Sequence, residues 1–240
     1  ETVWDSNSGW AKGTGLNSTL QSWMWKRGAG FDAIAYTGTG SYNDVPHSLG
    51  KKPEMVWVKR RDTGSTPWLV SHKGLNGGTN YMHYYATLNT NDAETDGSGQ
   101  GNKKFNTSSD HTATTIAIGN DSGWTNASGG TFLCMAFASV DGISKVGYYT
   151  GTASTQTITT GFQPRMMFLK NTTDDGYYWQ MVDTTRGWTS SSNKRMYFND
   201  PRAQDDNNII GEPLSTGFTI TGTNTGWNKN GSNYIYYAHA

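Results

Sequence analysis

The 240-residue sequence is poor in cysteine, in charge and in long apolar runs. Its single cysteine, Cys134, excludes an internal disulfide framework. Charged residues make up only 16% of the chain, and 19 basic side chains balance 19 acidic ones, so the electrostatic signature of a nucleic-acid or anionic-membrane binder is missing. The sequence has no run of 18 apolar residues, and we therefore expect no membrane insertion.

Two groups of residues dominate the composition instead. Glycine, threonine, serine and asparagine account for 104 of the 240 residues, and these types favour turns and strands over helices. Tryptophan, tyrosine and phenylalanine contribute 31 rings, each able to bury a large apolar area. The composition is typical of a folded all-β protein and not of a disordered chain.

The chain contains an internal repeat. Three stretches of the first copy return in the second: Ala35–Ser41 (AYTGTGS) at Tyr148–Ser154 (YYTGTAS), Pro53–Lys59 at Pro164–Lys170, and Asn126–Ala138 at Asn228–Ala240. The offset between the copies shrinks from 113 to 111 and then to 102 residues, which indicates loop deletions in the second copy. The largest deletion removes most of the polar loop Glu94–Asp110. This agrees with the general rule that surface loops vary more than the strands they connect.

The repeat predicts the domain organisation. We expect residues 1–30 to be the end of a preceding repeat or linking strands, residues 31–140 to be the first repeat and residues 141–240 to be the second. Because the chain opens at Glu1 inside a repeat, we also expect the natural protein to extend upstream. A unit of about 100 residues with many short strands has the scale of a β-sandwich. The predicted fold is therefore all-β, with two tandem sandwich repeats of the jelly-roll or lectin-like kind.

Short apolar runs between turn residues locate the strands. We expect strands at residues 54–59, 68–70, 114–118 and 132–137 in the first copy, and at 166–169, 178–182, 218–221 and 234–237 in the second. The run within Glu54–Lys59 is apolar without interruption, which fits a strand that is buried on both faces. We expect Met55, Trp57, Met166 and Phe168 to be buried either within the sandwich or between subunits.

Several of these motifs resemble a family of tandem-repeat domains in the structural proteins of tailed bacteriophages. The motifs are Phe31–Ser41, the stretch LGKKPEMVWVK that ends at Lys59, Asn126–Gly147, Tyr177–Gly187 and Glu212–Phe218. Such domains occur particularly in phages of marine bacteria, usually near the C-terminus of tail-fibre or tail-associated proteins. The resemblance implies a component of the virion, and it brings neither catalytic residues nor a known ligand site.

The histidines and the cysteine show no spacing typical of catalysis or of a metal site. The five histidines form no H-x-x-x-H or H-x-H pair, and we interpret them as structural or surface residues: His47, His72, His83, His111 and His239. Cys134 lies between Leu133 and Met135 in an apolar strand, as a small buried hydrophobic residue would. We therefore expect no enzyme activity and no cofactor.

One acidic segment resembles the first half of a calcium loop. Asp92, Glu94 and Asp96 occupy alternate positions before Gly97. Lys103 stands at the twelfth position, where an EF-hand requires a bidentate glutamate, so an EF-hand is excluded. A calcium loop of another kind and an ordinary solvated acidic loop both remain open, and the metal prediction is none.

Aromatic residues offer the other route to a binding site, because ring faces stack on sugars through their apolar C–H surfaces. Gly-Trp pairs recur at Trp10, Trp124 and Trp227, and this repetition favours packing of each turn against the sandwich over a ligand platform. Specificity resides more often in loops that are not repeated. The predicted ligand-binding rings are therefore those outside the repeat pattern, with core or subunit packing as their alternative role: Tyr81, Tyr84, Tyr85, Tyr177 and Trp188.

Together with the resemblance, these features lead to a functional hypothesis. We expect a non-enzymatic bacteriophage virion protein, a distal tail-fibre or appendage domain that mediates multivalent attachment to the host cell surface. The expected partners are other copies of the chain in a homotrimer, other phage virion proteins, and a host surface glycan or outer-membrane receptor. The expected location is the exterior of the virion, outside the cell. The alternatives are a capsid decoration or head-fibre protein, and a carbohydrate-binding module or capsule depolymerase domain.

Overall fold

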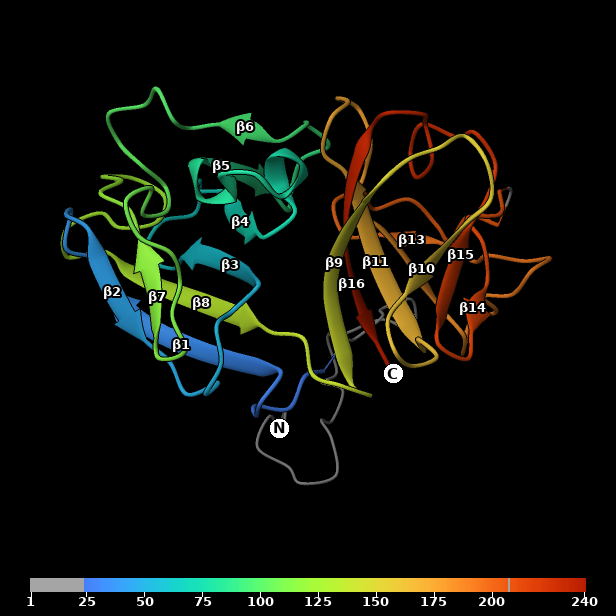
Figure 1. Ribbon diagram of the computed structural model, residues 1–240. Helices are drawn as coiled ribbons and strands as arrows, with labels where there is room; N and C mark the ends of the chain where they lie inside the picture. Colours follow the sequence, from blue (N-terminus) through green and yellow to red (C-terminus); the bar gives the residue numbers. More distant parts are fainter. Residues whose placement is uncertain (1–23, 207) are drawn as a thin grey trace, which may run out of the picture.

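The computed structural model describes residues 24–206 and 208–240, whose regular elements are β-strands and two 3₁₀ helices (Figure 1). The first half contains β1 (Phe31–Thr37), β2 (Asn43–Pro46), β3 (Met55–Arg60), β4 (Trp68–His72), η1 (Leu75–Gly78), η2 (Tyr81–His83), β5 (Tyr84–Thr87), β6 (Thr95–Asp96), β7 (Thr115–Ile118) and β8 (Thr131–Phe137). The second contains β9 (Ser144–Thr150), β10 (Gln156–Thr159), β11 (Met166–Asn171), β12 (Gln180–Asp183), β13 (Met196–Tyr197), β14 (Pro213–Leu214), β15 (Gly217–Ile220) and β16 (Asn233–His239). The all-β prediction is confirmed. Within the described residues, no helix has the length and apolar character needed to cross a membrane.

Each half is a sandwich of one large and one small antiparallel sheet. The large sheets have the strand orders β1-β8-β3-β4-β5-β6 and β9-β16-β11-β12-β13. The small sheets are β2-β7 in the first half and β10-β15-β14 in the second. Corresponding strands occupy corresponding places in the two halves, so the sequence repeat is also a structural repeat.

The two halves share a core, and the molecule therefore has four layers. The two large sheets face each other in the middle, and the small sheets lie on the outside (Figure 1). The central core combines side chains of both halves: Phe31, Met55, Trp57, Val70, Leu75, Ala86 and Phe137 from the first, and Val146, Phe168, Trp179, Met181, Ile235 and Tyr237 from the second. Each half also has its own outer core between its large and its small sheet.

The alternation of side chains along β3 explains its uninterrupted apolar run. Val56 and Val58 point into the outer core of the first half, whereas Met55 and Trp57 point into the central core. Successive side chains of a strand face opposite sides of its sheet, and both sides of this sheet are covered. The predicted burial on both faces is confirmed, and the surface that covers Met55 and Trp57 is the other half of the same chain.

The Thr-Gly of the repeated motif is fixed by a close backbone contact. A Cβ atom on Gly38 would lie 2.3 Å from the carbonyl oxygen of Ala127, and one on Gly151 would lie 2.1 Å from that of Lys229. The two contacts are equivalent under the repeat. Only glycine lets the end of the first strand of each half pass so close to the turn before its last strand.

A buried asparagine completes each of these turns. The Asn126 side chain accepts a hydrogen bond from the Thr39 amide (2.8 Å) and donates one to the Gly119 carbonyl (2.7 Å). Asn228 does the same for the Thr152 amide (3.0 Å) and the Gly222 carbonyl (2.7 Å). Both asparagines are fully buried, so these hydrogen bonds satisfy groups that would otherwise be costly to bury. These repeated polar residues hold the turns of the sandwich in place.

Hydrogen bonds at the rim also join the two halves. The end of β5 and the segment that follows it contact the second half through several of them, including Trp179 Nε1 to Thr87 O (2.9 Å), Asn199 Nδ2 to Thr90 O (2.6 Å), Gly176 N to Asn91 O (2.9 Å) and Glu94 N to Thr172 O (2.9 Å). The buried His72 bridges β4 and β16, because its Nδ1 accepts the Gly74 N–H (2.9 Å) and its Nε2 lies 3.2 Å from the Tyr236 carbonyl. The halves are therefore not independent domains on a flexible linker.

The shared central core predicts that the two halves unfold together. Trp57→Ala and Phe168→Ala, one in each half, should each lower the free energy of unfolding by about 3–5 kcal/mol, because each leaves a cavity in the same core. Urea denaturation followed by fluorescence and by circular dichroism should give one coincident transition in every variant. The exposed Thr157→Ala is the control and should shift stability by about 0.5 kcal/mol at most. Two separate transitions would contradict the shared core.

Two buried histidines predict a loss of stability in acid. Burial lowers the pKa of His72 to about 3 and that of His111 to about 4, from an ordinary value of 6.5. Below pH 6.5 the unfolded chain takes up protons that the folded chain excludes, so stability falls from pH 6.5 towards pH 4. Burial also raises the pKa of Glu94 to about 7, so uptake of a proton by this carboxyl group stabilises the folded chain as the pH falls. This effect of one group opposes that of the two histidines and is smaller than their sum.

The measurement is urea denaturation at pH 7.5 and pH 5. The wild-type chain should be less stable at pH 5, and His72→Gln should reduce the proton uptake on unfolding at that pH by about one proton. A variant with the same pH dependence as the wild type would show that His72 is not the group responsible.

Candidate binding surface

Tyr81 stands between two hollows on the surface of the first half. One hollow, of about 370 Å³, is lined by Gly78, Asn80, Tyr81, Met82, His83, Thr107, Ser108, Ser109 and Asp110. The other, of about 350 Å³, is lined by Lys51, Lys52, Glu54, Lys73, Tyr81, Ala138 and Ser139. The first of them is built by the η1–η2 segment and by the loop 97–110, both of which differ from the corresponding parts of the second half.

Asp110 fixes the Tyr81 ring in this position. The Tyr81 hydroxyl donates a hydrogen bond to Asp110 Oδ1, and the Lys52 ammonium pairs with Oδ2. The Lys52 nitrogen also lies 5.6 Å from the centroid of the Tyr81 ring, within reach of a cation–π contact. Burial acts to raise the pKa of Asp110, but the hydrogen bonds from Lys52 and Tyr81 hold it below its ordinary value. The ring is thus held in place while it still lines both hollows.

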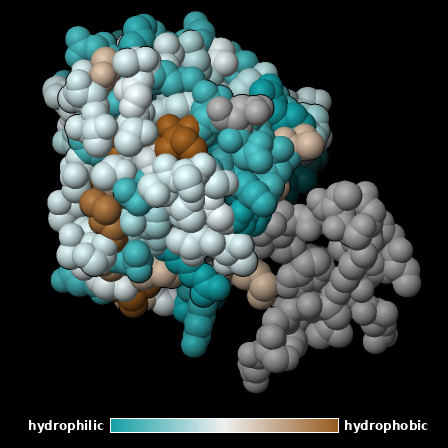
Figure 2. All heavy atoms as spheres, turned by 90° about the vertical axis from the view of Figure 1, so that its right-hand side faces the viewer, coloured by the Kyte–Doolittle hydropathy of each residue, from teal (hydrophilic) through white to brown (hydrophobic). Residues whose placement is uncertain are grey.

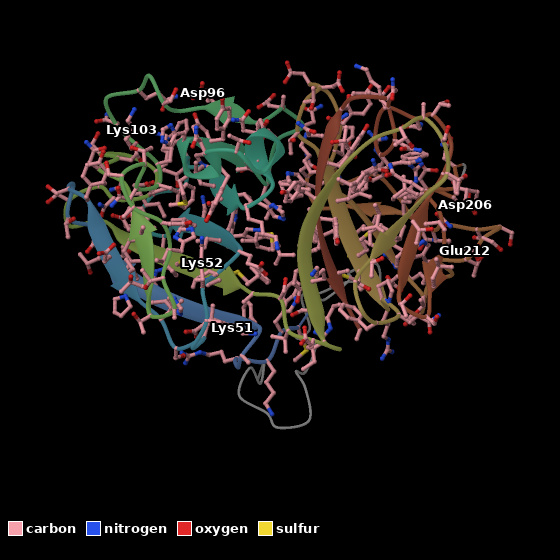
Figure 3. The ribbon with its side chains drawn as sticks, viewed as in Figure 1. Lys51, Lys52, Asp96, Lys103, Asp206 and Glu212 are labelled. Carbon is pink, nitrogen blue, oxygen red and sulfur yellow. The ribbon has the colours of Figure 1, made fainter. Side chains whose placement is uncertain are left out.

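A second ion pair shapes the lysine-lined hollow. Lys73 Nζ lies 2.5 Å from Glu54 Oε1, and Glu54 Oε2 accepts the Ser139 amide at 2.7 Å. Burial acts to raise the pKa of Glu54, yet the hydrogen bonds from Lys73 and Ser139 keep it low. Lys51 donates to the Ser139 carbonyl (3.1 Å), and Lys51 and Lys52 lie on the segment that leads into β3 (Figure 3). The hollow offers several donors and ionised acceptors to a polar ligand.

The structure places the predicted binding rings of the first half in different environments. Tyr81 lines both hollows, and Tyr84 is half-buried with its hydroxyl 3.3 Å from Asp96 Oδ2. Tyr85 is buried in the outer core, with 8% of its surface exposed. Tyr85 therefore packs in the core and presents no free face to a ligand.

Of the two predicted rings of the second half, Trp188 packs in the outer core and Tyr177 is half-buried. Trp188 is 1% exposed in the outer core, and its Nε1 donates to the Gly211 carbonyl at 2.9 Å. Tyr177 is half-buried, and its carbonyl accepts a hydrogen bond from Lys170 Nζ at 2.7 Å. The five predicted rings do not form one site, and Tyr81 is the member that lines the hollows.

The three alternating acids do not converge on one point. Glu94 Oε2 accepts the Asn76 amide at 2.8 Å, and Asp96 Oδ1 accepts the Ser98 amide at 2.7 Å. Burial lowers the pKa of Lys170 to about 8, and the negative charge of Asp92 acts against this by favouring the protonated ammonium. In the described part of the chain, no group of three histidine, cysteine or acidic side chains is placed to hold a metal ion. The alternation that resembled a calcium loop instead gives each carboxylate a different partner. Asp96 ends β6, and Lys103 lies on the loop that follows it (Figure 3).

Cys134 and two of the histidines belong to the interior, as expected. Cys134 is fully buried, and burial raises the pKa of its thiol. His72 and His111 are also buried, and the Nδ1 of His111 accepts the Ala117 amide at 3.1 Å. The structural interpretation of these three residues is confirmed.

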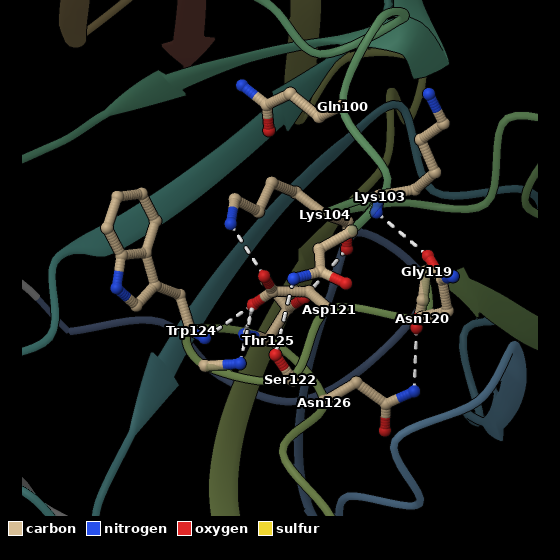
Figure 4. Close-up of polar contacts among 12 residues, drawn as sticks. Gln100, Lys103, Lys104, Gly119, Asn120, Asp121, Ser122, Trp124, Thr125 and Asn126 are labelled. Carbon is tan, nitrogen blue, oxygen red and sulfur yellow. Dashed lines mark hydrogen bonds and ion pairs between the residues drawn. The ribbon is translucent and has the colours of Figure 1, made fainter.

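Asp121 organises a second cluster at the far end of the loop 97–110 (Figure 4). Its Oδ1 pairs with Lys104 Nζ at 2.6 Å, and its Oδ2 accepts the amides of Gly123, Trp124 and Thr125. The Lys104 nitrogen lies 4.2 Å from the centroid of the Trp124 ring. The side chains of Lys104 and Asp121 are 12% and 3% exposed, whereas the Trp124 residue is 36% exposed.

The equivalent tryptophan of the second half is buried. Trp227 is 3% exposed, donates from Nε1 to the Thr221 carbonyl (2.8 Å) and has the Arg195 guanidinium 5.1 Å from its ring centroid. The predicted packing of the Gly-Trp turn is therefore correct for Trp227 and wrong for the Trp124 ring. Trp10 lies outside the described residues.

Sequence reasoning missed the charged residues of the hollows and the exposure of Trp124. One signal was present: the first copy has two more residues than the second between Leu49 and Pro53, and this insertion brings the pair Lys51-Lys52. For Trp124 no signal existed, because its Gly-Trp motif is the same in both copies.

The outer face of the second half offers a contrast. In Figure 2, hydrophobic residues on this face are scattered singly among hydrophilic ones, without a broad apolar patch. Scattered apolar residues are normal on a protein surface and indicate no docking site. The candidate binding surface is thus the polar one on the first half, from Tyr81 along the loop 97–110 to Trp124.

The Asp121 cluster predicts a large effect from one substitution. Asp121→Ala should lower the free energy of unfolding by about 3–5 kcal/mol, because it leaves Lys104 buried without its partner and frees three amides. Urea denaturation measures this loss. Asp62→Ala is the control, since Asp62 forms a more exposed pair with Arg60 and its loss should matter little. Equal effects of the two substitutions would contradict the role given to Asp121.

Comparisons with known proteins give a family without an assigned activity. No curated protein and no solved structure matches the chain. One family model matches residues 4–240, and its description is a domain of unknown function, DUF7483. Since this match covers nearly the whole length, the chain belongs to the DUF7483 family.

Proposed function

We propose that this chain is a non-enzymatic domain of a bacteriophage appendage, a distal part of a tail fibre, that attaches the virion to the host cell surface. The resemblance of its motifs to tandem-repeat domains of phage structural proteins supports this proposal. So does the architecture, in which the first of two copies of the same fold carries two polar hollows, one of them built by segments that differ from those of the second copy.

The observation that carries the proposal is the pair of hollows around Tyr81. They combine residues of the η1–η2 segment, of the loop 97–110 and of the insertion before β3, all on a four-layer β scaffold. Binding residues in many proteins lie on variable loops that a rigid scaffold positions. Asp110 and Glu54 fix the side chains before a ligand arrives, which lowers the entropy lost on binding.

The protonation states in the hollows favour binding over catalysis. A glycoside hydrolase needs one carboxyl group that stays protonated as a general acid, beside a second that is ionised. Glu54 and Asp110 both have lowered pKa values because lysines hold them, so both are ionised near neutral pH. Glu94 has a raised pKa but lines neither hollow. This pattern supports a non-enzymatic role.

In this role the partners would be other copies of the chain in a homotrimer, other virion proteins, and a host surface glycan or outer-membrane receptor. Each copy would contribute one set of hollows. Linked copies bind a surface far more strongly than one copy does, because each further contact forms at a high effective concentration. Modest affinity per hollow is then sufficient for attachment on the virion exterior.

Labelling of bacterial cells tests the proposal. The fluorescently tagged chain should label at least one strain of a panel of marine bacteria in a saturable way. Lys51→Glu and Tyr81→Phe should each reduce the apparent affinity by about fivefold or more, which corresponds to about 1 kcal/mol. Lys51→Glu should leave the melting temperature unchanged, whereas Tyr81→Phe should lower it slightly because it removes the hydrogen bond to Asp110.

Tyr178→Phe is the matched control, because it removes the hydroxyl of a half-buried tyrosine in the second half, and it should label cells as the wild type does. Absence of labelling on every strain, or release of reducing sugar ends from the polysaccharide of a labelled strain, would overturn the proposal.

A further inference from the structure

The indole of Trp124 is an exposed ring that the fold holds in place. The residue is 36% exposed, yet the Lys104 nitrogen lies 4.2 Å from the centroid of its ring and is itself fixed by Asp121 at 2.6 Å. The side chains of Lys104 and Asp121 are only 12% and 3% exposed. A cation–π contact with this largely buried, paired lysine restrains the ring from one face.

The same carboxylate also fixes the backbone beneath the ring. Asp121 Oδ2 accepts the amides of Trp124 and, at 2.9 Å, Thr125, and Thr125 Oγ1 donates to the Lys104 carbonyl at 2.8 Å. Figure 4 shows these contacts converging on Asp121. Both the ring and its turn are therefore ordered before any ligand binds, and binding costs little further conformational entropy.

The second half shows that this fold can bury the ring. Trp227 occupies the equivalent position, is 3% exposed, and donates its Nε1–H to the Thr221 carbonyl at 2.8 Å. An exposed surface tryptophan needs no explanation by itself. Here, however, one copy of a motif buries its indole, whereas the other leaves it partly exposed and restrains it through Lys104 and Asp121.

We propose that Trp124 is a stacking platform for one neutral sugar ring of a glycan. The flat apolar face of the indole fits the C–H face of a pyranose. Lys104 already supplies the cation contact on one face of the ring, and its pairing with Asp121 leaves little net charge there to attract an ionic ligand of either sign. Neutral polar side chains on the adjoining turn and loop suit hydroxyl groups: Asn102 Nδ2 donates to Ser122 Oγ at 3.3 Å.

This inference rests on the proposed attachment function, because it names the class of ligand that the proposed binding surface would take. It has its own readout, the Nε1–H resonance of the indole. Titration of the ¹⁵N-labelled chain with methyl pyranosides of glucose, galactose, mannose and N-acetylglucosamine should shift the Trp124 resonance in a saturable way. The Trp227 resonance should stay unchanged, because that indole is buried. Trp124→Phe identifies the resonance by its disappearance.

Two variants complete the test. Trp124→Ala should weaken sugar binding by about tenfold or more, measured by saturation transfer to the sugar protons. Tyr42→Ala removes another exposed ring, 47% exposed, and should bind as the wild type does. The inference is overturned if no sugar of the panel shifts the Trp124 resonance, or if Trp124→Ala binds sugar with unchanged affinity.

The outcomes separate this inference from the attachment function. If the chain labels no bacterial strain but sugars still shift the Trp124 resonance, the attachment function fails and the platform stands. If cells are labelled and no sugar shifts that resonance, the platform fails alone.

Discussion

The aromatic core between the two large sheets is the contact on which the rest of the molecule depends. Rings from both halves interlock there: the Trp57 and Phe168 centroids lie 5.6 Å apart, and those of Phe137 and Tyr237 lie 5.3 Å apart. Because this core covers the inner face of each large sheet and an outer core covers the opposite face, the middle strands of both large sheets are covered on both faces. Variation that leaves the fold intact is therefore confined to loops and sheet edges, which is where the candidate surface lies.

The repeat separates structural residues from candidate binding residues within one chain. Features present in both halves, such as Asn126 with Asn228 and Gly38 with Gly151, hold turns that both sandwiches need. Features present in one half, such as the ion pair of Asp110 with Lys52, hold side chains that the scaffold does not need. Comparison of the two copies thus separates residues that the fold requires from residues that it does not. The differences between the copies indicate candidate binding residues better than the composition of the chain does.

The sequence predicts this fold well and the site only in part. Strand positions agree to within a few residues, because apolar runs and turn residues report local conformation directly. The same pattern could not say whether Met55 faces a second subunit or the second half, since both surfaces demand the same apolar residue. For the site, a place outside the repeat pattern selected Tyr81, which lines both hollows, together with Tyr85 and Trp188, which are buried, because a position outside the repeat does not report burial. Contacts such as Lys52 with Asp110 join distant segments, and only the fold brings those together.

The balance of charge in the composition reappears at the candidate surface. Lys52, Lys73 and Lys104 each pair with a carboxylate, so the surface combines many directional donors and acceptors with little net field. Ion pairing at these three lysines weakens long-range attraction of a polyanion and favours recognition by the geometry of short-range contacts. Uncharged sugar hydroxyls are satisfied by such contacts, although each hydrogen bond contributes only modestly in water. In the proposed attachment role, the overall affinity for the cell surface must then come from the number of copies that bind together. A surface of low charge lets those copies lie side by side without electrostatic repulsion.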